Sequence, residues 1–151
     1  MLLVEDSEHD AFFFQQAMQK ADVSFPLRVV TDGLQAVDYL TGAPPYSDRN
    51  QFPLPRLVLL DLKIPKKSGF EVLEWIRAEP PLRDLPVLIL TSSSERPDIF
   101  RAYDLGVILY ITKPIGMTSL RALVRALAAY WEDLEHGPQP DLVSFAMRRP
   151  G

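Results

Sequence analysis

The sequence lacks cysteine, a dense block of lysine and arginine, and any apolar run long enough to cross a membrane. The absence of cysteine excludes disulfides, thiolate metal ligands and a cysteine nucleophile, and it fits a reducing compartment. Nucleic acid is not an expected partner, because the net charge is -4 and no basic patch is visible. A membrane span needs roughly 18 apolar residues in a row, and a secretory leader needs a basic start and an apolar core. We therefore expect a cytoplasmic protein that binds neither nucleic acid nor membrane.

The chain has 151 residues, of which 47% are hydrophobic and 24% are charged, and this composition is ordinary for one globular domain. Short apolar runs alternate with segments of helical period, a pattern typical of a parallel sheet covered by helices. We predict a single α/β domain over residues 1–136 and a flexible tail over residues 137–151. The last helix, from about Met117, is longer than the sheet alone requires, because its apolar stripe continues to Leu134.

Five apolar runs are the candidate strands, at residues 1–4, 27–30, 57–60, 87–90 and 107–111. Helices are predicted between them by apolar period and by capping residues, such as Ser7 before the first helix and Gly42 after the second. The third and fourth helices are expected at residues 69–77 and 94–104. Residues 43–55 contain four prolines and no period, which predicts a surface loop.

Polar residues lie at or just after the ends of four of the predicted strands. These residues are Glu5 with Asp6, Asp61, Thr91, and Lys113 with Pro114. In a parallel sheet they all fall at the carboxyl edge, where open α/β sheets build their sites. Carboxylates beside a hydroxyl and a lysine predict a site for a divalent cation and a phosphoryl group, since hard cations take oxygen ligands and phosphoryl oxygens need positive charge.

Asp61 is the candidate nucleophile, since it follows the central apolar run, where its carboxylate can project into the crevice while its backbone stays in the sheet. The adjacent acids Glu5 and Asp6 are costly beside a third carboxylate unless a cation neutralises them. An oxygen-only site that also takes phosphate favours Mg²⁺. Each acid by itself is explained as well by a helix cap or a solvated charge.

Thr91 is predicted to donate its hydroxyl to a phosphoryl oxygen, and Lys113 to supply a point charge. The step from Lys113 to Pro114 is a candidate cis peptide that aims the lysine inward. A threonine in a serine-rich turn and a surface lysine are more often structural. The order of these signals at successive strand ends therefore carries the prediction.

Four motifs occur in the order V-E-D, L-L-D-L-K-I-P-x-x-S-G, L-T-S and Y-x-T-K-P. Thr91 lies 30 positions after Asp61, and Lys113 lies 22 positions after Thr91. With these motifs and spacings, residues 1–131 resemble the receiver domain of two-component response regulators. The resemblance implies a flavodoxin-like receiver fold, with a five-stranded parallel sheet of order 2-1-3-4-5 and helices on both faces.

The same resemblance implies a mechanism in which a histidine kinase phosphorylates Asp61. It implies that Mg²⁺ is held by Glu5, Asp6, Asp61 and the backbone carbonyl of Lys63. After transfer, Thr91 would shift toward the phosphoryl group and Tyr110 would change rotamer, which alters the face of the fourth strand, fourth helix and fifth strand. Such a switch is a two-state equilibrium biased by one modification.

Two residues and one loop depart from the receiver pattern. Glu5 stands where receivers often have aspartate, Lys63 stands where they often have Asn or Met, and the loop before the third strand is longer than in many relatives. Glutamate still ligates Mg²⁺. The cation two residues after Asp61 leads to the hypothesis that Lys63 alters the rate at which the phosphoryl group is hydrolysed.

Expected partners also follow from the resemblance. Nothing of domain size follows Trp131, so we expect a stand-alone receiver whose output runs through protein contacts. The long loop, the P-K-K-S-G turn and the aromatic end of the last helix resemble the small regulators that serve phytochrome-type histidine kinases. The connection to light rests on this likeness.

Two surfaces are candidates for protein contacts. Aromatic residues toward the fourth and fifth helices predict a homodimer through the fourth helix, fifth strand and fifth helix, although packing inside the domain explains roughly half of such residues. They are Tyr103, Tyr110, Tyr130 and Trp131, with Leu134 beside them. Phe12 and Phe13 form a second candidate surface for a kinase helix, because three consecutive phenylalanines span too wide an arc to face one core.

Two other classes of function stay open. A phosphatase with an aspartate nucleophile would share Asp61 and the cation, but Lys63 replaces its usual acid/base carboxylate, which argues against turnover of added substrates. We therefore expect only Mg²⁺-dependent self-phosphorylation and self-dephosphorylation. A binding module that works without phosphorylation would keep the fold, but it leaves the complete site unexplained.

Overall fold

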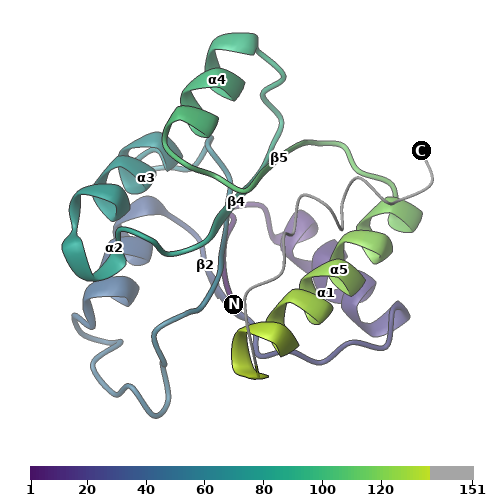
Figure 1. Ribbon diagram of the computed structural model, residues 1–151, viewed down its shortest axis with the longest axis horizontal. Helices are drawn as coiled ribbons and strands as arrows, with labels where there is room; N and C mark the ends of the chain where they lie inside the picture. The colour runs from purple at the N-terminus through teal and green to yellow at the C-terminus, as the bar shows by residue number, and fades with distance from the viewer. Residues whose placement is uncertain (137–151) are drawn as a thin grey trace.

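The computed structural model describes residues 1–136 and shows a central sheet with helices on both sides (Figure 1). The strands are β1 (Leu2–Val4), β2 (Arg28–Val30), β3 (Val58–Leu60), β4 (Val87–Thr91) and β5 (Leu109–Thr112). The helices are α1 (Glu8–Lys20), α2 (Gly33–Thr41), α3 (Gly69–Ala78), the 3-10 turn η1 (Pro80–Leu82), α4 (Arg96–Asp104) and α5 (Met117–His136). All paired strands are parallel in the order β2-β1-β3-β4-β5, which confirms the predicted topology. The tail predicted at residues 137–151 lies outside the described residues.

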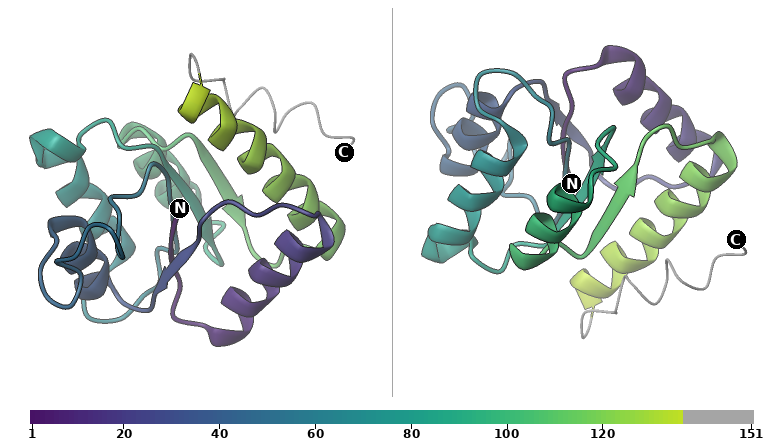
Figure 2. Two further views of the ribbon diagram at one scale, coloured as in Figure 1. Left: turned by 90° about the horizontal axis from the view of Figure 1, so that it is seen from below. Right: turned by 90° about the horizontal axis from the view of Figure 1, so that it is seen from above.

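Alternate residues of each central strand face two separate cores. In β1, Leu2 and Val4 lie in the core that includes α2 and α3, whereas Leu3 lies in the core that includes α1 and α5. Strands β3 and β4 alternate in the same way and are buried along their whole length. Figure 2 shows the two helical layers on opposite faces of the sheet. Burial on both faces explains why the strand sequences are apolar at successive positions.

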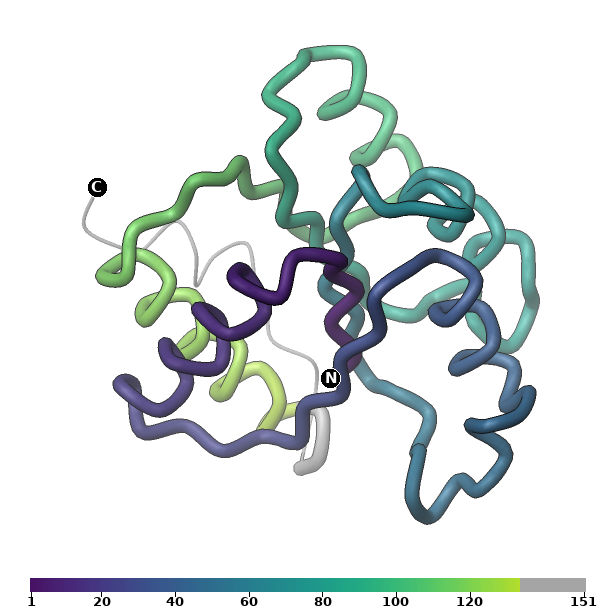
Figure 3. The backbone as a smooth tube through the Cα atoms, turned by 180° about the vertical axis from the view of Figure 1, so that it is seen from behind, coloured from purple at the N-terminus to yellow at the C-terminus, as the bar shows by residue number. Residues whose placement is uncertain are grey.

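Helices α1 and α5 lie side by side on one face of the sheet (Figure 3). Ser7 caps α1 as predicted, because its hydroxyl accepts from the Asp10 backbone N–H at 3.2 Å. The buried residues of these two helices include Phe14, Ala17, Met18, Leu120, Leu123, Val124 and Leu127. These buried positions recur at helical spacing and so confirm the apolar period expected for the two helices, whereas the side chain of Leu134 lies outside the described residues.

Helix α4 begins at Arg96, two residues after the predicted start. The backbone of Glu95 is extended, with φ of -69° and ψ of 131°, and its N–H donates to the Ser93 hydroxyl at 3.4 Å. Pro97 lies in the first turn, where its missing N–H costs nothing. The serine-rich sequence before Arg96 therefore forms the loop between β4 and α4.

Strand β5 begins at Leu109 rather than at Val107. Gly106 has a φ of +77°, and the Val107 N–H donates to the Ala102 carbonyl at 3.3 Å, which keeps Val107 in the turn after α4. Val107 is nevertheless buried. Its apolar side chain indicates that the residue is buried. The sequence pattern does not distinguish a buried turn residue from a strand residue.

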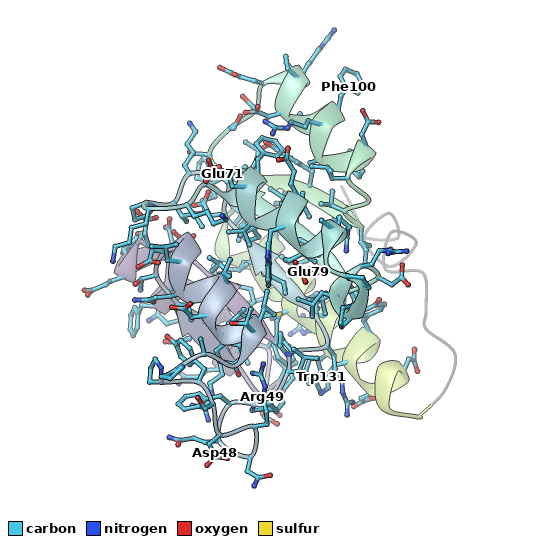
Figure 4. The ribbon with its side chains drawn as sticks, turned by 90° about the vertical axis from the view of Figure 1, so that its left-hand side faces the viewer. Asp48, Arg49, Glu71, Glu79, Phe100 and Trp131 are labelled. Atoms are coloured by element: carbon cyan, nitrogen blue, oxygen red, sulfur yellow. The ribbon has the colours of Figure 1, made fainter. Side chains whose placement is uncertain are left out.

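Arg49 organises the loop of residues 43–55, which projects below α2 in Figure 4. Helix α2 ends at Gly42, whose φ of +77° is the left-handed conformation that favours glycine. The Arg49 guanidinium donates to the carbonyls of Tyr39 and Leu40 at 2.8 and 3.0 Å, and so satisfies the end of α2. The predicted surface loop is therefore tied to the helix before it.

Candidate functional site

Three backbone hydrogen bonds extend the sheet past its regular strands and set the predicted site residues along one edge. The Glu5 N–H donates to Val30 at 3.0 Å, the Asp61 N–H donates to Val4 at 3.1 Å, and the Lys113 N–H donates to Thr91 at 2.7 Å. Thr91 is itself the last residue of β4. The sequence-based expectation of one shared carboxyl edge is confirmed.

Asp61 occupies the middle of this edge with only 6% of its surface exposed. Its Oδ1 accepts from the Thr91 hydroxyl at 2.7 Å and from the Lys63 backbone N–H at 3.0 Å. Its Oδ2 accepts from Lys113 Nζ at 3.0 Å. Gly69, at the start of α3, approaches so closely that an added Cβ would lie 2.4 Å from the Asp61 carbonyl oxygen. The backbone of Asp61 is therefore held between the sheet and α3.

Lys113 is the cation of the site, and its peptide bond to Pro114 is cis, as predicted. Its ammonium donates to Glu5, to Asp10 at 2.9 Å and to Asp61 at 3.0 Å. Burial alone would lower the pKa of Lys113, but the hydrogen bonds to these three carboxylates outweigh burial and raise it. Lys113 therefore stays charged.

Burial raises the pKa of the Glu5 carboxyl, although the bond from Lys113 opposes that shift. Glu5, Asp6 and Asp61 each place one carboxylate oxygen within 4.8 Å of the others. Three carboxylates so close together repel one another, and oxygen ligands of this kind suit a hard divalent cation. The residues present therefore fit a metal site, with Asp6 exposed to solvent at its rim.

Tyr110 connects β5 to the loop between β4 and α4. Its hydroxyl donates to the Ser93 carbonyl at 2.8 Å, and its backbone N–H donates to the Tyr103 hydroxyl at 3.1 Å. The Ser93 hydroxyl in turn donates to Asp98 of α4 at 2.6 Å. Burial raises the pKa of the Tyr110 phenol, so it stays a hydrogen-bond donor near neutral pH. The segment next to Thr91 and the start of α4 are thus joined by side chains.

Sequence reasoning missed two contacts at this edge. Asp10 binds Lys113, and a signal was available, because Asp10 lies in the first turn of the helix that follows Glu5 and Asp6. Asp32 caps α2 and lies 3.4 Å from Lys66 of the loop after Asp61. No local pattern connects that second pair, because the two loops meet only in the folded chain.

The predicted contact surfaces differ in exposure. Tyr130 is only 3% exposed and lies in the core beneath α5, so its assignment to an interface was wrong. Tyr103 is 45% exposed, and Phe100 beside it on α4 is 67% exposed (Figure 4). Phe12 is 58% exposed, whereas Phe13 is half-buried and stacks on His9.

A hollow of about 480 Å³ lies between α1 and the segment after β5. It is lined by Asp10, Phe13, Phe14, Leu90, Ser92, Lys113, Pro114, Ile115 and Leu120. Of the two predicted phenylalanines, Phe13 therefore faces this hollow beside the site. Within residues 1–136, none of the helices combines the length and apolarity that a membrane crossing requires.

The family model described as "Response regulator receiver domain" matches residues 1–125. The chain is 36% identical over 131 residues to response regulator Rcp1 of Synechocystis sp., covering 87% of this chain and 87% of Rcp1. The structure of the phosphorylated cyanobacterial phytochrome response regulator RcpA is similar, with a TM-score of 0.77 and 37% identity, covering 92% of this chain and 96% of RcpA. The Mn²⁺-bound form of Rcp1 is similar with a TM-score of 0.75 and 36% identity, over 92% of this chain and 96% of Rcp1. By sheet order, site geometry and these matches, the chain belongs to the response regulator receiver domain family.

Proposed function

We propose that this protein is a response regulator that receives a phosphoryl group on Asp61 from the phosphohistidine of a histidine kinase. One observation carries the proposal: the buried Asp61 carboxylate contacts both Thr91 and Lys113 and lies within 4.8 Å of two further acids. In the transfer, the phosphorus–nitrogen bond of the donor breaks and an Asp61 oxygen–phosphorus bond forms. The donor histidine leaves with the electron pair of the broken bond.

We assign the cation site to Mg²⁺, with Glu5, Asp6, Asp61 and the Lys63 backbone carbonyl as ligands. When bound, the cation neutralises charge on the acids and on the phosphoryl oxygens. The Mn²⁺-bound form of Rcp1 supports a divalent cation in a relative. The Lys63 N–H donates to Asp61 at 3.0 Å, so this stretch of backbone already lies beside the carboxylate.

Thr91 and Lys113 are assigned to the phosphoryl oxygens. Both side chains contact Asp61 before transfer, so each needs only to exchange that bond for one to the new group. The positive charge on Lys113 offsets the charge that gathers on the phosphoryl oxygens, and the Thr91 hydroxyl donates to one of them.

The output is assigned to the segment that joins Thr91 to Tyr110. A shift of Thr91 toward the phosphoryl group pulls on the loop after β4, whose Ser93 carbonyl accepts the Tyr110 hydroxyl. Release of that bond frees Tyr110 to change rotamer and α4 to move, which is a two-state change biased by one modification.

The phytochrome assignment is part of this proposal. Support comes from RcpA, which is described as a phytochrome response regulator and resembles 92% of this chain. We infer a phytochrome-type histidine kinase as donor. Because the donor draws its phosphoryl group from ATP, we place the protein in the cytoplasm. Its only expected reactions are self-phosphorylation and self-dephosphorylation.

We further propose a homodimer through α4, β5 and α5. The exposed aromatic rings of Phe100 and Tyr103 support this face, since aromatic residues are enriched at interface cores. Sedimentation with and without phosphorylation tests the dimer. A monomeric mass that does not change with concentration or phosphorylation refutes it.

Intact mass after incubation with acetyl phosphate and Mg²⁺ tests the central proposal. We expect one phosphoryl adduct in the parent protein and none in Asp61→Asn or after chelation of the metal. A folded parent protein without an adduct contradicts the proposal. Equal affinity of Asp61→Asn and the phosphorylated parent for the output partner would favour the phosphorylation-independent module, and steady hydrolysis of an added phosphate monoester would favour the phosphatase.

A further inference from the structure

Lys113 contacts a carboxylate that the proposed function does not use. Its ammonium donates to Asp10 Oδ2 at 2.9 Å, as well as to Glu5 and Asp61. An ammonium group has three N–H donors, and these three carboxylates account for all of them. Asp10 is therefore a direct partner of Lys113.

Asp10 differs from the other two partners because it is not part of the cation cluster. That cluster, among the residues described, consists of Glu5, Asp6 and Asp61. A bound cation attracts the oxygens of Glu5 and Asp61, and phosphorylation turns one Asp61 oxygen into an ester. Both events engage carboxylate oxygens that now accept from Lys113, whereas neither involves the carboxylate of Asp10.

The position of Asp10 is fixed by the start of α1. Its backbone N–H donates to the Ser7 cap at 3.2 Å, and its side chain lies in the first helical turn, where the helix dipole favours a carboxylate. The Lys113 side chain is only 14% exposed, whereas that of Asp10 is 39% exposed. The lysine is thus enclosed, and the aspartate holds it from the solvent side of the site.

We propose that Asp10 is a positioning residue for Lys113. It keeps the ammonium at the phosphorylation site while Glu5 and Asp61 exchange their bonds to Lys113 for bonds to the cation and the phosphoryl group. This inference rests on the proposed function, because it depends on the role of Lys113 beside the phosphoryl oxygens. It makes the first turn of α1 part of the reacting site.

A double-mutant cycle on Asp10 and Lys113 tests the proposal, with the initial rate of phosphoryl uptake from acetyl phosphate as the readout. We expect Asp10→Ala to slow uptake roughly threefold to tenfold, as befits a charge-assisted hydrogen bond that is partly exposed. Asp10→Asn keeps the shape but loses the charge and should slow uptake less. In a Lys113→Ala background, Asp10→Ala should have no further effect, because no ammonium is left to hold.

Glu8→Ala is the matched control, since Glu8 is an exposed acid in the same helical turn. It should leave uptake unchanged. The ¹⁵N signal of the Lys113 ammonium should shift in Asp10→Asn and not in Glu8→Ala, a difference that a general loss of stability does not produce. Thermal melts check folding, and Asp10→Asn replaces Asp10→Ala in the cycle if the alanine variant does not fold.

Three results overturn the role of Asp10 while the proposed function stands. They are a normal uptake rate in both Asp10 variants, the same slowing in the Lys113→Ala background, and the same slowing in Glu8→Ala. A folded parent protein that takes up no phosphoryl group instead contradicts the proposed function, and the role of Asp10 falls with it.

Discussion

Arg77, near the end of α3, binds the turn after η1 and the turn after α4. Its replacement tests how much these bonds stabilise the face of the sheet opposite α1 and α5. Its guanidinium donates to four backbone carbonyls, those of Leu105 at 2.7 Å, Leu85 at 2.7 Å, Arg83 at 2.9 Å and Gly106 at 3.2 Å. Burial lowers the pKa of Arg77, yet its ordinary value is so high that the group stays charged. One side chain thus supplies hydrogen bonds to backbone carbonyls in the turn after η1 and in the turn after α4.

We expect Arg77→Met to lower the free energy of unfolding by about 2 to 3 kcal/mol. A fully buried hydrogen bond to a charged donor contributes about 1.5 to 3 kcal/mol, but two of these four bonds are exposed and the other two are only partly buried, so each contributes less than that. Methionine keeps much of the apolar packing of the arginine stem. The corresponding fall in Tm is about 5 to 10 °C for a domain of this size. Urea denaturation followed by circular dichroism measures the loss.

Arg101→Met is the matched control for Arg77→Met. The Arg101 side chain is 51% exposed, pairs with Glu74 and lies 4.2 Å from the ring centroid of Phe70. Because exposed ion pairs and exposed cation–π contacts each contribute little, we expect a loss of less than about 1 kcal/mol. Equal losses of unfolding free energy in the two variants, or a loss below about 1 kcal/mol in Arg77→Met, would refute the view that the hydrogen bonds of Arg77 to the four carbonyls stabilise the fold.

Gly69→Ala should lower the free energy of unfolding by about 1 to 3 kcal/mol, because the new Cβ would overlap the backbone of Asp61. Urea denaturation measures this loss, and intact mass should show slower phosphoryl uptake. Parent-like values in both measurements would contradict the close approach of Gly69 to Asp61. Lys63→Asn should lengthen the life of the phosphoryl group, because it removes a cation that can stabilise charge in the hydrolytic transition state; an unchanged lifetime by intact mass contradicts this. Arg49→Met should speed amide hydrogen exchange across residues 43–55 but leave phosphoryl uptake unchanged, since its carbonyl partners are remote from the site. Protection equal to that of the parent protein would show that other contacts hold the loop.

The ends of the elements were predictable where one residue type forces the backbone. Ser7 caps α1 and Gly42 ends α2 in the left-handed conformation, both as expected from local chemistry. The start of β5 was not predictable in this way, because Val107 is equally apolar in a buried turn or in a strand. The burial of the Tyr130 side chain likewise depends on the packing of α5 against the sheet.

The meeting of Asp61, Thr91 and Lys113 follows from the order of residues alone, because each closes an apolar strand and parallel strands share a carboxyl edge. The contact of Asp10 with Lys113, across 103 positions of sequence, depends instead on the packing of the folded chain. The contact of Asp32 with Lys66 depends on it in the same way. Strand ends follow from local composition. Contacts between a helix and a distant loop depend instead on the packing of the two cores, which fixes where the helices and loops lie relative to one another.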